Sequence, residues 1–201
     1  LRTLTSLLEQ DRTLVRGFGP SGLNPLQEAT YAGSVEAVHV LLTAGADLSA
    51  QSPSTGKTAV AMAAESGRAE ILKILLDKGA DFRTPDRTGA TPVEVAIRGS
   101  RQDCLELLLA AGADPSAPGS RGIRPLEHAA SRGMSAAIRP LILRGANANW
   151  ADPLTGQTAL HRAALSGCED CVKVLLAMGA VPVKDRNGET PLDLASRAQH
   201  G

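Results

Sequence analysis

Two cysteines three positions apart, Cys168 and Cys171 in the segment GCEDC, are the residues whose type and spacing most directly suggest chemistry. Cys-x-x-Cys pairs occur in dithiol redox sites and in zinc sites. A zinc site needs a second pair of ligands, and no such pair follows at a suitable spacing. A redox pair of this kind usually joins a strand to a helix, whereas the surrounding pattern is helical. We therefore expect Cys171 to be a small buried residue, and a reactive Cys168 at a helix N-terminus is the alternative.

No other group of residues predicts catalysis. The sequence has no Gly-x-Ser-x-Gly motif, no phosphate-binding loop and no paired carboxylates, and its four histidines are widely separated, at His39, His128, His161 and His200. We therefore expect no catalytic, cofactor-binding or metal-binding residues, and we expect that the chain is not an enzyme.

The composition excludes several other functions. Apolar residues make up 43% of the 201 residues but aromatic residues only 2%, so Ala, Leu and Val must fill the core. Lys and Arg total 21 and so do Asp and Glu, so no bulk charge attracts nucleic acid or a membrane surface. No apolar run is long enough to span a bilayer. We expect protein partners, and neither nucleic acid, membrane insertion nor a small-molecule substrate.

The cysteine count bears on the compartment. Three cysteines are too few, and odd in number, for a disulfide framework. This indicates an intracellular, reducing compartment, with the cytoplasm favoured and the nucleus or an organelle left open. Because the sequence begins with Leu1 and both ends resemble incomplete units, we expect a longer parent protein.

A repeat of about 33 residues organises the sequence. The dipeptide Gly-Ala recurs with spacings of 34, 33, 33 and 34 residues, at Gly45, Gly79, Gly112, Gly145 and Gly179. A second landmark, exemplified by GATPV at 89–93 and GQTAL at 156–160, keeps the same period. Two motifs that share one period indicate a structural repeat.

Each repeat contains signals for two helices. Thr91 can cap a helix that begins with Pro92, and Glu94 can complete a capping box. A Gly then permits a sharp turn, and an apolar stripe follows, as in AEILKILLDKG at 69–79. The Gly of Gly-Ala ends this second helix, and a polar loop leads to the next repeat.

This pattern resembles the ankyrin repeat, most closely in TALHRAALSGCEDCVKVLLAMGA at 158–180. The resemblance implies an all-α solenoid of stacked helix-turn-helix units with β-hairpin finger loops. It also implies a structural hydrogen-bonding role for His161. We expect five repeats, at about 20–53, 54–86, 87–119, 120–153 and 154–186. Residues 1–19 then form the second helix of a partial repeat, at 4–10, and its finger, and residues 187–201 form a partial repeat or cap.

Three departures from the repeat have local consequences. Arg124 replaces the capping Thr, and Gly99 places the turn glycine of the third repeat one position early. Pro140 falls inside a second helix, where it removes a backbone hydrogen bond. We expect a kink or a late start there, unless Pro140 lies in the first turn.

The resemblance implies a binding role for the concave face formed by fingers and first helices. By register, the candidate partner-binding residues are Tyr31, Glu65, Arg98, Arg132 and Leu165 on first helices, and Arg87, Arg121 and Ile123 in fingers. The four arginines would form a patch for an acidic segment. A solvated surface paired with Asp86, Glu94 and Glu127 is the alternative.

The single tryptophan, Trp150, lies at an expected finger tip. It is either an exposed contact for a partner or folded onto Pro153 or the neighbouring finger. The expected function is a non-catalytic protein–protein interaction module. The alternatives are a structural subunit of a large assembly and the regulatory region of a longer enzyme.

Overall fold

A computed structural model describes residues 12–199 of the chain. The chain divides into two compact units, unit 1 at 1–111 and unit 2 at 112–201, and each is described by itself. The helix expected at 4–10 lies outside the described residues. Within 12–199 the regular structure is entirely helical, so the expected all-α class is confirmed.

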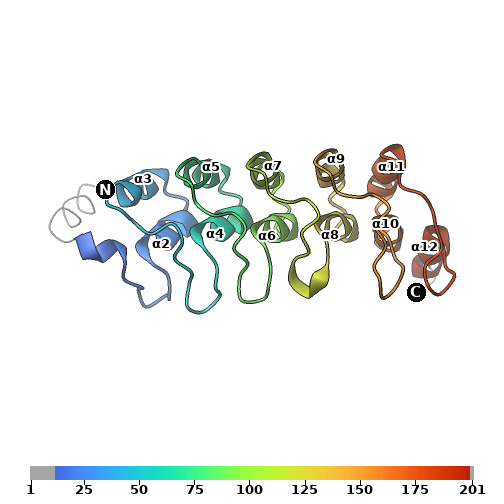
Figure 1. The fold of residues 1–201 in the computed structure, drawn as a ribbon, viewed down its shortest axis with the longest axis horizontal. Coiled ribbons are helices and arrows are strands. Elements are labelled where there is room, and N and C mark those ends of the chain that lie inside the picture. Colours follow the sequence, from blue (N-terminus) through green and yellow to red (C-terminus); the bar gives the residue numbers. More distant parts are fainter. Residues whose placement is uncertain (1–11, 200–201) are drawn as a thin grey trace. The chain divides into compact units, whose positions relative to one another are not determined.

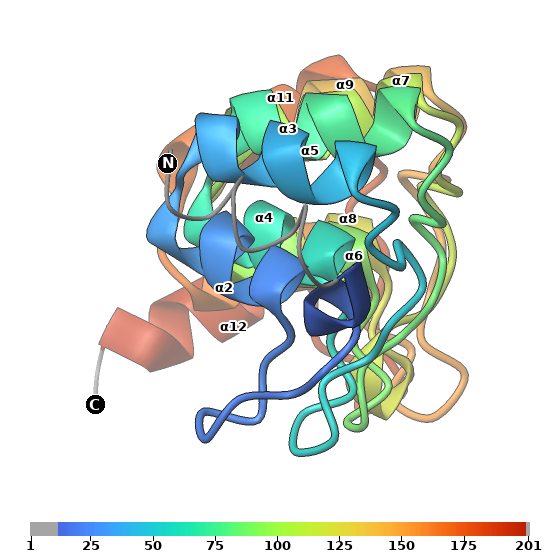
Figure 2. The same ribbon diagram turned by 90° about the vertical axis from the view of Figure 1, so that its left-hand side faces the viewer.

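Unit 1 is a stack of helix pairs. After the short 3₁₀ helix η1, Arg12–Val15, the first helices α2, α4 and α6 lie side by side, and the second helices α3, α5 and α7 form another row (Figure 1). The loops that precede α2 and α4 extend below the first helices in Figure 2. The helices are α2 Pro25–Ala32, α3 Val35–Thr43, α4 Ala59–Ser66, α5 Ala69–Asp77, α6 Pro92–Arg98 and α7 Gln102–Ala110.

Unit 2 continues the same alternation. The first helices α8, α10 and α12 pack in sequence, and the second helices α9 and α11 pack against each other (Figure 1). Its elements are η2 Ser120–Gly122, α8 Pro125–Ser131, α9 Ser135–Leu143, α10 Ala159–Leu165, α11 Glu169–Ala177 and α12 Pro191–Gln199.

Helix caps account for where the first helices begin. The Asn24 side chain accepts the N–H of Gln27 at 2.8 Å, and Gln27 accepts the N–H of Asn24 at 3.0 Å, which completes a capping box. The predicted cap at Thr91 is also confirmed, because its hydroxyl accepts the Glu94 N–H at 3.2 Å. A turn glycine with φ +79°, Gly33, then reverses the chain between α2 and α3.

The core is thin and aliphatic, as the composition predicts. In α4 the small residues Ala59, Ala61, Ala63 and Ala64 are at most 2% exposed. They allow neighbouring first helices to approach closely, while leucines and isoleucines fill the space between the two rows. The largest buried side chains of unit 1 include Leu41, Ile71, Leu72, Leu75, Leu105 and Leu108.

The finger loops close as tight turns. In the finger before α6, the Asp86 N–H donates to the Ala90 carbonyl at 2.9 Å, and the Asp152 N–H donates to Gln157 at 2.9 Å in the finger before α10. No strand is present in residues 12–199, because so few backbone hydrogen bonds per finger do not build a ladder. The fingers are therefore hairpin turns without β-strands.

At two of the three positions where the sequence departs from the repeat, the structure differs from the prediction. The first is Pro140. Helix α9 begins at Ser135 and continues through Pro140, so the late start is wrong. The fully buried Ala137, Ile138 and Leu141 hold the helix in place despite the missing N–H.

The turn after α6 also has an unexpected conformation. Gly99 keeps a right-handed conformation, and Ser100 takes the left-handed one with φ +54°. A Cβ at Gly99 would lie 2.8 Å from the Glu65 carbonyl oxygen, which explains why glycine is needed there.

Candidate functional site

In α2 and α10, a side chain in the first turn joins the repeat to the finger of the next. Gln27 in α2 donates its amide to the Lys57 carbonyl at 3.0 Å, and Lys57 directly precedes the cap of α4. His161 in α10 makes the same connection, from Nε2 to the Glu189 carbonyl at 3.2 Å. His161 Nδ1 lies 3.1 Å from the Thr158 nitrogen, whose N–H it accepts, and the ring is fully buried. The structural hydrogen-bonding role implied for His161 is therefore confirmed.

In unit 1, the candidate residue Glu65 forms ion pairs with two cations, Lys57 and Arg98. Its two carboxylate oxygens contact Lys57 Nζ at 2.5 Å and Arg98 Nη2 at 3.2 Å. Arg98 is thus paired with Glu65, not with any of the three acidic residues considered from the sequence. Because these side chains are partly exposed, the pairs contribute little to stability but fix the orientation of Arg98.

The side chains of two further candidate residues in unit 1 are exposed to solvent. Tyr31, in the last turn of α2, is 64% exposed, although its carbonyl accepts a hydrogen bond from Arg68 Nη2 at 3.4 Å. Arg87 is exposed at a finger, and its backbone N–H donates to Thr55 of the preceding finger at 2.9 Å. Within residues 12–199, no acidic side chain lies at ion-pair distance from Arg87.

In unit 2, the finger that contains η2 presents Arg121 and Ile123 together. Arg121 has φ +60°, a left-handed conformation that is unfavourable for a residue with a side chain. Its side chain is exposed, and Ile123 is 39% exposed. Strained backbone positions are found more often at functional sites than elsewhere.

Trp150 folds onto the neighbouring finger region. The guanidinium of Arg124 lies 4.4 Å from the centre of the indole ring, a cation–π contact, and Trp150 is half-buried. Arg124 Nη1 also donates to the Ser116 carbonyl at 3.1 Å. Arg124, which does not cap α8 through its side chain, instead covers the tryptophan.

The other candidates of unit 2 lie near the ends of first helices. Leu165 is the last residue of α10 and is 43% exposed. Arg132 is exposed but follows the last residue of α8, Ser131, whereas Arg98 is itself the last residue of α6. The register assigned to Arg132 from the sequence is therefore shifted by one position. Since the four arginines are divided between the two units, their convergence into one patch stays a prediction.

Glu127, expected from the sequence to be a surface partner of the arginines, is a buried carboxyl group. It is 6% exposed in α8 and accepts the N–H of Arg124 at 3.1 Å. Burial raises the pKa of Glu127 to about 7, and Asp152 adds to the rise while Arg162 and Arg124 oppose it. By register, Glu127 occupies the position of Gln27 and His161, both of which donate to the next finger. A polar residue at this register position, the third residue of a first helix, was the sequence signal that could have identified Glu127 as buried.

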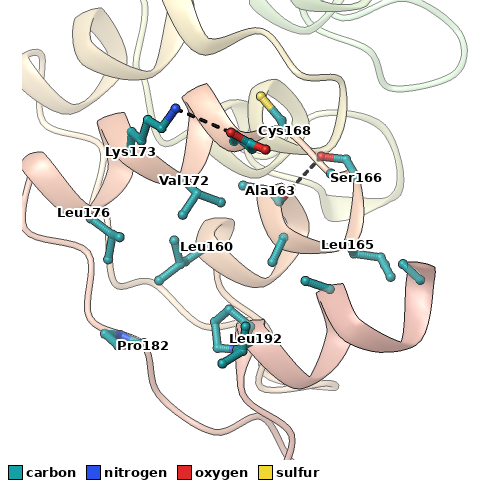
Figure 3. Close-up of a pocket in the computed structure, with 16 residues that line it drawn as sticks. Leu160, Ala163, Leu165, Ser166, Cys168, Val172, Lys173, Leu176, Pro182 and Leu192 are labelled. Carbon is teal, nitrogen blue, oxygen red and sulfur yellow. Dashed lines mark hydrogen bonds and ion pairs between the residues drawn. The ribbon is translucent and has the colours of Figure 1, made fainter. Parts of the chain in front are cut away.

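An apolar groove lies between α10, α11 and α12 in unit 2 (Figure 3). Its volume is about 610 Å³, and its lining includes Leu160, Leu165, Val172, Leu176, Pro182 and Leu192. Leu176 and Leu192 are 47% and 75% exposed, so no described residue covers them fully. Helix α11 packs against the second helix α9 and the first helix α10. A further helix in the groove would pack in the same way, against the second helix α11 and the first helices α10 and α12.

Cys168 and Cys171 are joined by a disulfide bond, which the sequence analysis did not predict. Cys168 is the N-cap residue of α11 and Cys171 lies in its first turn, a relation that brings two side chains together in every capping box. Cys171 is fully buried, as predicted, and Cys104 is a free, buried cysteine. Within residues 12–199, no cluster of His, Cys, Asp and Glu side chains suits a metal ion.

Comparisons with known proteins agree with this architecture. A family model of ankyrin repeats in three copies matches residues 26–118 and 126–201. The crystal structure of the ankyrin repeat domain of Bcl-3, described as a unique member of the IkappaB protein family, superposes with a TM-score of 0.83 at 29% sequence identity. That alignment covers 99% of this chain and 91% of the Bcl-3 chain.

Curated relatives match over shorter stretches. Ankyrin repeat and SOCS box protein 6 of Homo sapiens is 46% identical over 69 residues, and its Mus musculus counterpart is 45% identical. In both cases the match spans 33% of this chain and 16% of the relative. The ankyrin repeat and KH domain-containing protein mask of Drosophila melanogaster is 35% identical over 85 residues, which is 42% of this chain and 2% of that protein. None of the helices within 12–199 is long and apolar enough to cross a membrane.

Proposed function

Because this chain belongs to the ankyrin repeat family, whose members generally mediate protein–protein interactions, we propose that it binds a protein partner through its fingers and first helices without catalysis. The observation that carries the proposal is the exposure of large apolar side chains on these elements in a chain with few aromatic residues. Tyr31, Ile123 and Leu165 are 64%, 39% and 43% exposed. Apolar side chains beside cations are typical of interface contacts.

The finger of η2 indicates the chemistry of the partner. Arg121 offers a planar fork that binds a carboxylate through two hydrogen bonds, and Ile123 offers an apolar contact two residues later. The partner segment therefore carries an Asp or Glu next to an aliphatic or aromatic residue. In unit 1, Arg87 and Tyr31 provide the same two kinds of contact, and Glu65 holds Arg98 in place.

Selection from a displayed library of random peptides on the purified chain tests this proposal. We expect the enriched peptides to combine an acidic residue with a neighbouring apolar residue. Reversal of charge by Arg121→Glu is expected to weaken binding of such a peptide at least about tenfold, because a carboxylate would then face a carboxylate.

Arg139→Glu is the matched control for this experiment. Arg139 is also an exposed arginine of unit 2, but it lies on the second helix α9. We expect this variant to bind the selected peptide like the unaltered chain. Equal weakening by both variants would reduce the effect to overall charge, and enrichment of basic peptides would overturn the proposal.

The groove between α10, α11 and α12 favours a second candidate function, that of a structural subunit held permanently by apolar contacts. Its occupant would be an amphipathic helix like α11, with aliphatic residues on one face. Leu176→Asp together with Leu192→Asp would abolish such binding and leave the peptide binding at η2 intact. The two functions are therefore separable by experiment.

A further inference from the structure

The disulfide between Cys168 and Cys171 lies at the N-terminus of α11. The two Cα atoms are 5.2 Å apart, and the N–H of Cys171 points at Cys168 Sγ at 3.1 Å. A backbone N–H in this position stabilises negative charge on the sulfur when the bond is open, as does the positive end of the helix dipole.

The two cysteine residues differ in exposure. Cys171 is 0% exposed and lies in the core between the helix rows. Cys168 is partly exposed and lies at the rim of the apolar groove, as Figure 3 shows. A small thiol or disulfide in solution can therefore reach Cys168, whereas Cys171 is reached only through Cys168.

The charged groups around Cys168 carry a net negative charge, which one lysine reduces. Glu169 and Asp170 follow it directly and disfavour a second negative charge nearby. Lys173 Nζ lies 3.5 Å from Glu169 and 3.8 Å from Asp170, so its positive charge compensates both carboxylates in part.

The corresponding position in unit 1 holds a free thiol. Cys104 lies in the first turn of α7 as Cys171 lies in the first turn of α11, and its N-cap neighbour is Arg101. Cys104 is free and 1% exposed. Burial raises its pKa to about 11, which makes it an unreactive internal reference.

We propose that Cys168 and Cys171 form a reversible thiol–disulfide site, in which Cys168 exchanges with small-molecule disulfides such as oxidised glutathione and Cys171 resolves the product. In the oxidising direction, the Cys168 thiolate attacks one sulfur of the small disulfide and releases one small thiolate. Cys171 then attacks Cys168 Sγ, and its proton leaves with the second small thiolate, which departs as a thiol. Two protein thiols become one disulfide, and the small disulfide is reduced to two thiols. The proposal does not rest on the peptide binding proposed at η2, although Cys168 also lines the groove of the second candidate function.

Titration of the whole folded chain with mixtures of reduced and oxidised glutathione tests the proposal. Acid quenching followed by alkylation and peptide mass spectrometry measures each cysteine separately. We expect Cys168 and Cys171 to change together, from bonded in oxidised mixtures to free in reduced mixtures, while Cys104 stays free throughout. In the reduced chain we expect Cys168 to be alkylated at least about tenfold faster than Cys104.

Single variants identify the exchanging sulfur. Cys171→Ser is expected to accumulate a glutathione adduct on Cys168, because nothing resolves it, and Cys168→Ser is expected to form no adduct while folded. Circular dichroism verifies that each variant is folded, and the titration of the unaltered chain decides the question if one is not. A pair that stays bonded in excess reduced glutathione, stays open in excess oxidised glutathione, or takes the adduct on Cys171 would overturn the proposal.

Discussion

His161 donates through Nε2 to the Glu189 carbonyl at 3.2 Å, and its Nδ1 accepts the N–H of Thr158 at 3.1 Å. The ring is therefore neutral, with its proton on Nε2, and it links helix α10 to the finger that precedes α12. The Thr158 N–H depends on this ring, because both residues are buried and water does not reach them, whereas the Glu189 carbonyl also accepts the Asp185 N–H at 2.8 Å.

Substitution of this histidine separates hydrogen bonding from packing. We expect His161→Leu to lower the free energy of unfolding by about 1–3 kcal/mol, since it leaves the N–H of the buried Thr158 without its acceptor and removes one of the two hydrogen bonds to the Glu189 carbonyl. His161→Gln is expected to cost less, because Gln27 makes the same two connections in unit 1. Urea unfolding of both variants measures the difference, and equal losses would contradict the hydrogen-bonding role.

Glu127 predicts a pH dependence of stability. Its pKa is raised by burial to about 7 in the folded chain, above the ordinary value of 4.5, so the folded chain binds this proton more tightly than the unfolded chain. The stabilisation is complete below pH about 4.5 and is lost as the pH rises through about 7. We expect a loss of the order of 2 kcal/mol between pH 5 and 8.

The matched variant for this effect is Glu127→Gln, which copies the residue found at position 27. It keeps an acceptor for the Arg124 N–H but cannot ionise, so thermal unfolding should depend less on pH between 5 and 8 than in the unaltered chain. Measurements stay above pH 5 because Asp47 and Asp81, whose pKa values are lowered by hydrogen bonds from Ser49 and Thr84, lose their charge at lower pH. The same slope in both proteins would assign the pH dependence to other groups.

Ser100 is expected to be a site where glycine stabilises the chain. Its φ of +54° is costly for a residue with a Cβ atom. We expect Ser100→Gly to raise the free energy of unfolding by about 0.5–1 kcal/mol, less any entropy gained by the unfolded chain. Ser66→Gly, at the last helical residue of α4, is the control and should destabilise instead. Urea unfolding compares the two, and a loss in both would argue against strain at Ser100.

Fluorescence of Trp150 reports the Arg124 contact directly, because the chain has a single tryptophan. We expect Arg124→Ala to raise the quenching of Trp150 by acrylamide and to shift its emission to longer wavelength, since the covering guanidinium is removed. The associated loss of stability should be about 0.5–1 kcal/mol. Arg121→Ala should leave the fluorescence unchanged, and an equal change in both variants would exclude a specific contact.

The period of the sequence predicted the helices, their caps and the aliphatic core, because these follow from local chemistry that every repeat restates. Thr91 and Asn24 cap helices as the residue types require, and Cys171 is buried as its position in the apolar stripe requires. Such features depend on neighbours within a few positions of the chain.

Features that depend on contacts between distant residues were harder to predict. Glu65 selects Arg98 as its partner from the following repeat, and Arg124, at the start of the fourth repeat, reaches Trp150 near the end of the same repeat. Competition between several arginines and several carboxylates cannot be decided from spacing alone. The cysteine pair is different, since N-cap and first-turn positions at three residues' separation were enough to bring the two sulfurs together.

Gln27 and His161 each donate a hydrogen bond from one repeat to a main-chain carbonyl in the finger of the next repeat, and we call this connection the joint. Every finger possesses such a carbonyl, whatever its sequence. A whole repeat can therefore be excised or duplicated, and the joint forms again with the new neighbour. Repeats connected in this way are interchangeable during evolution, and their outward-facing residues are free to diverge toward new partners.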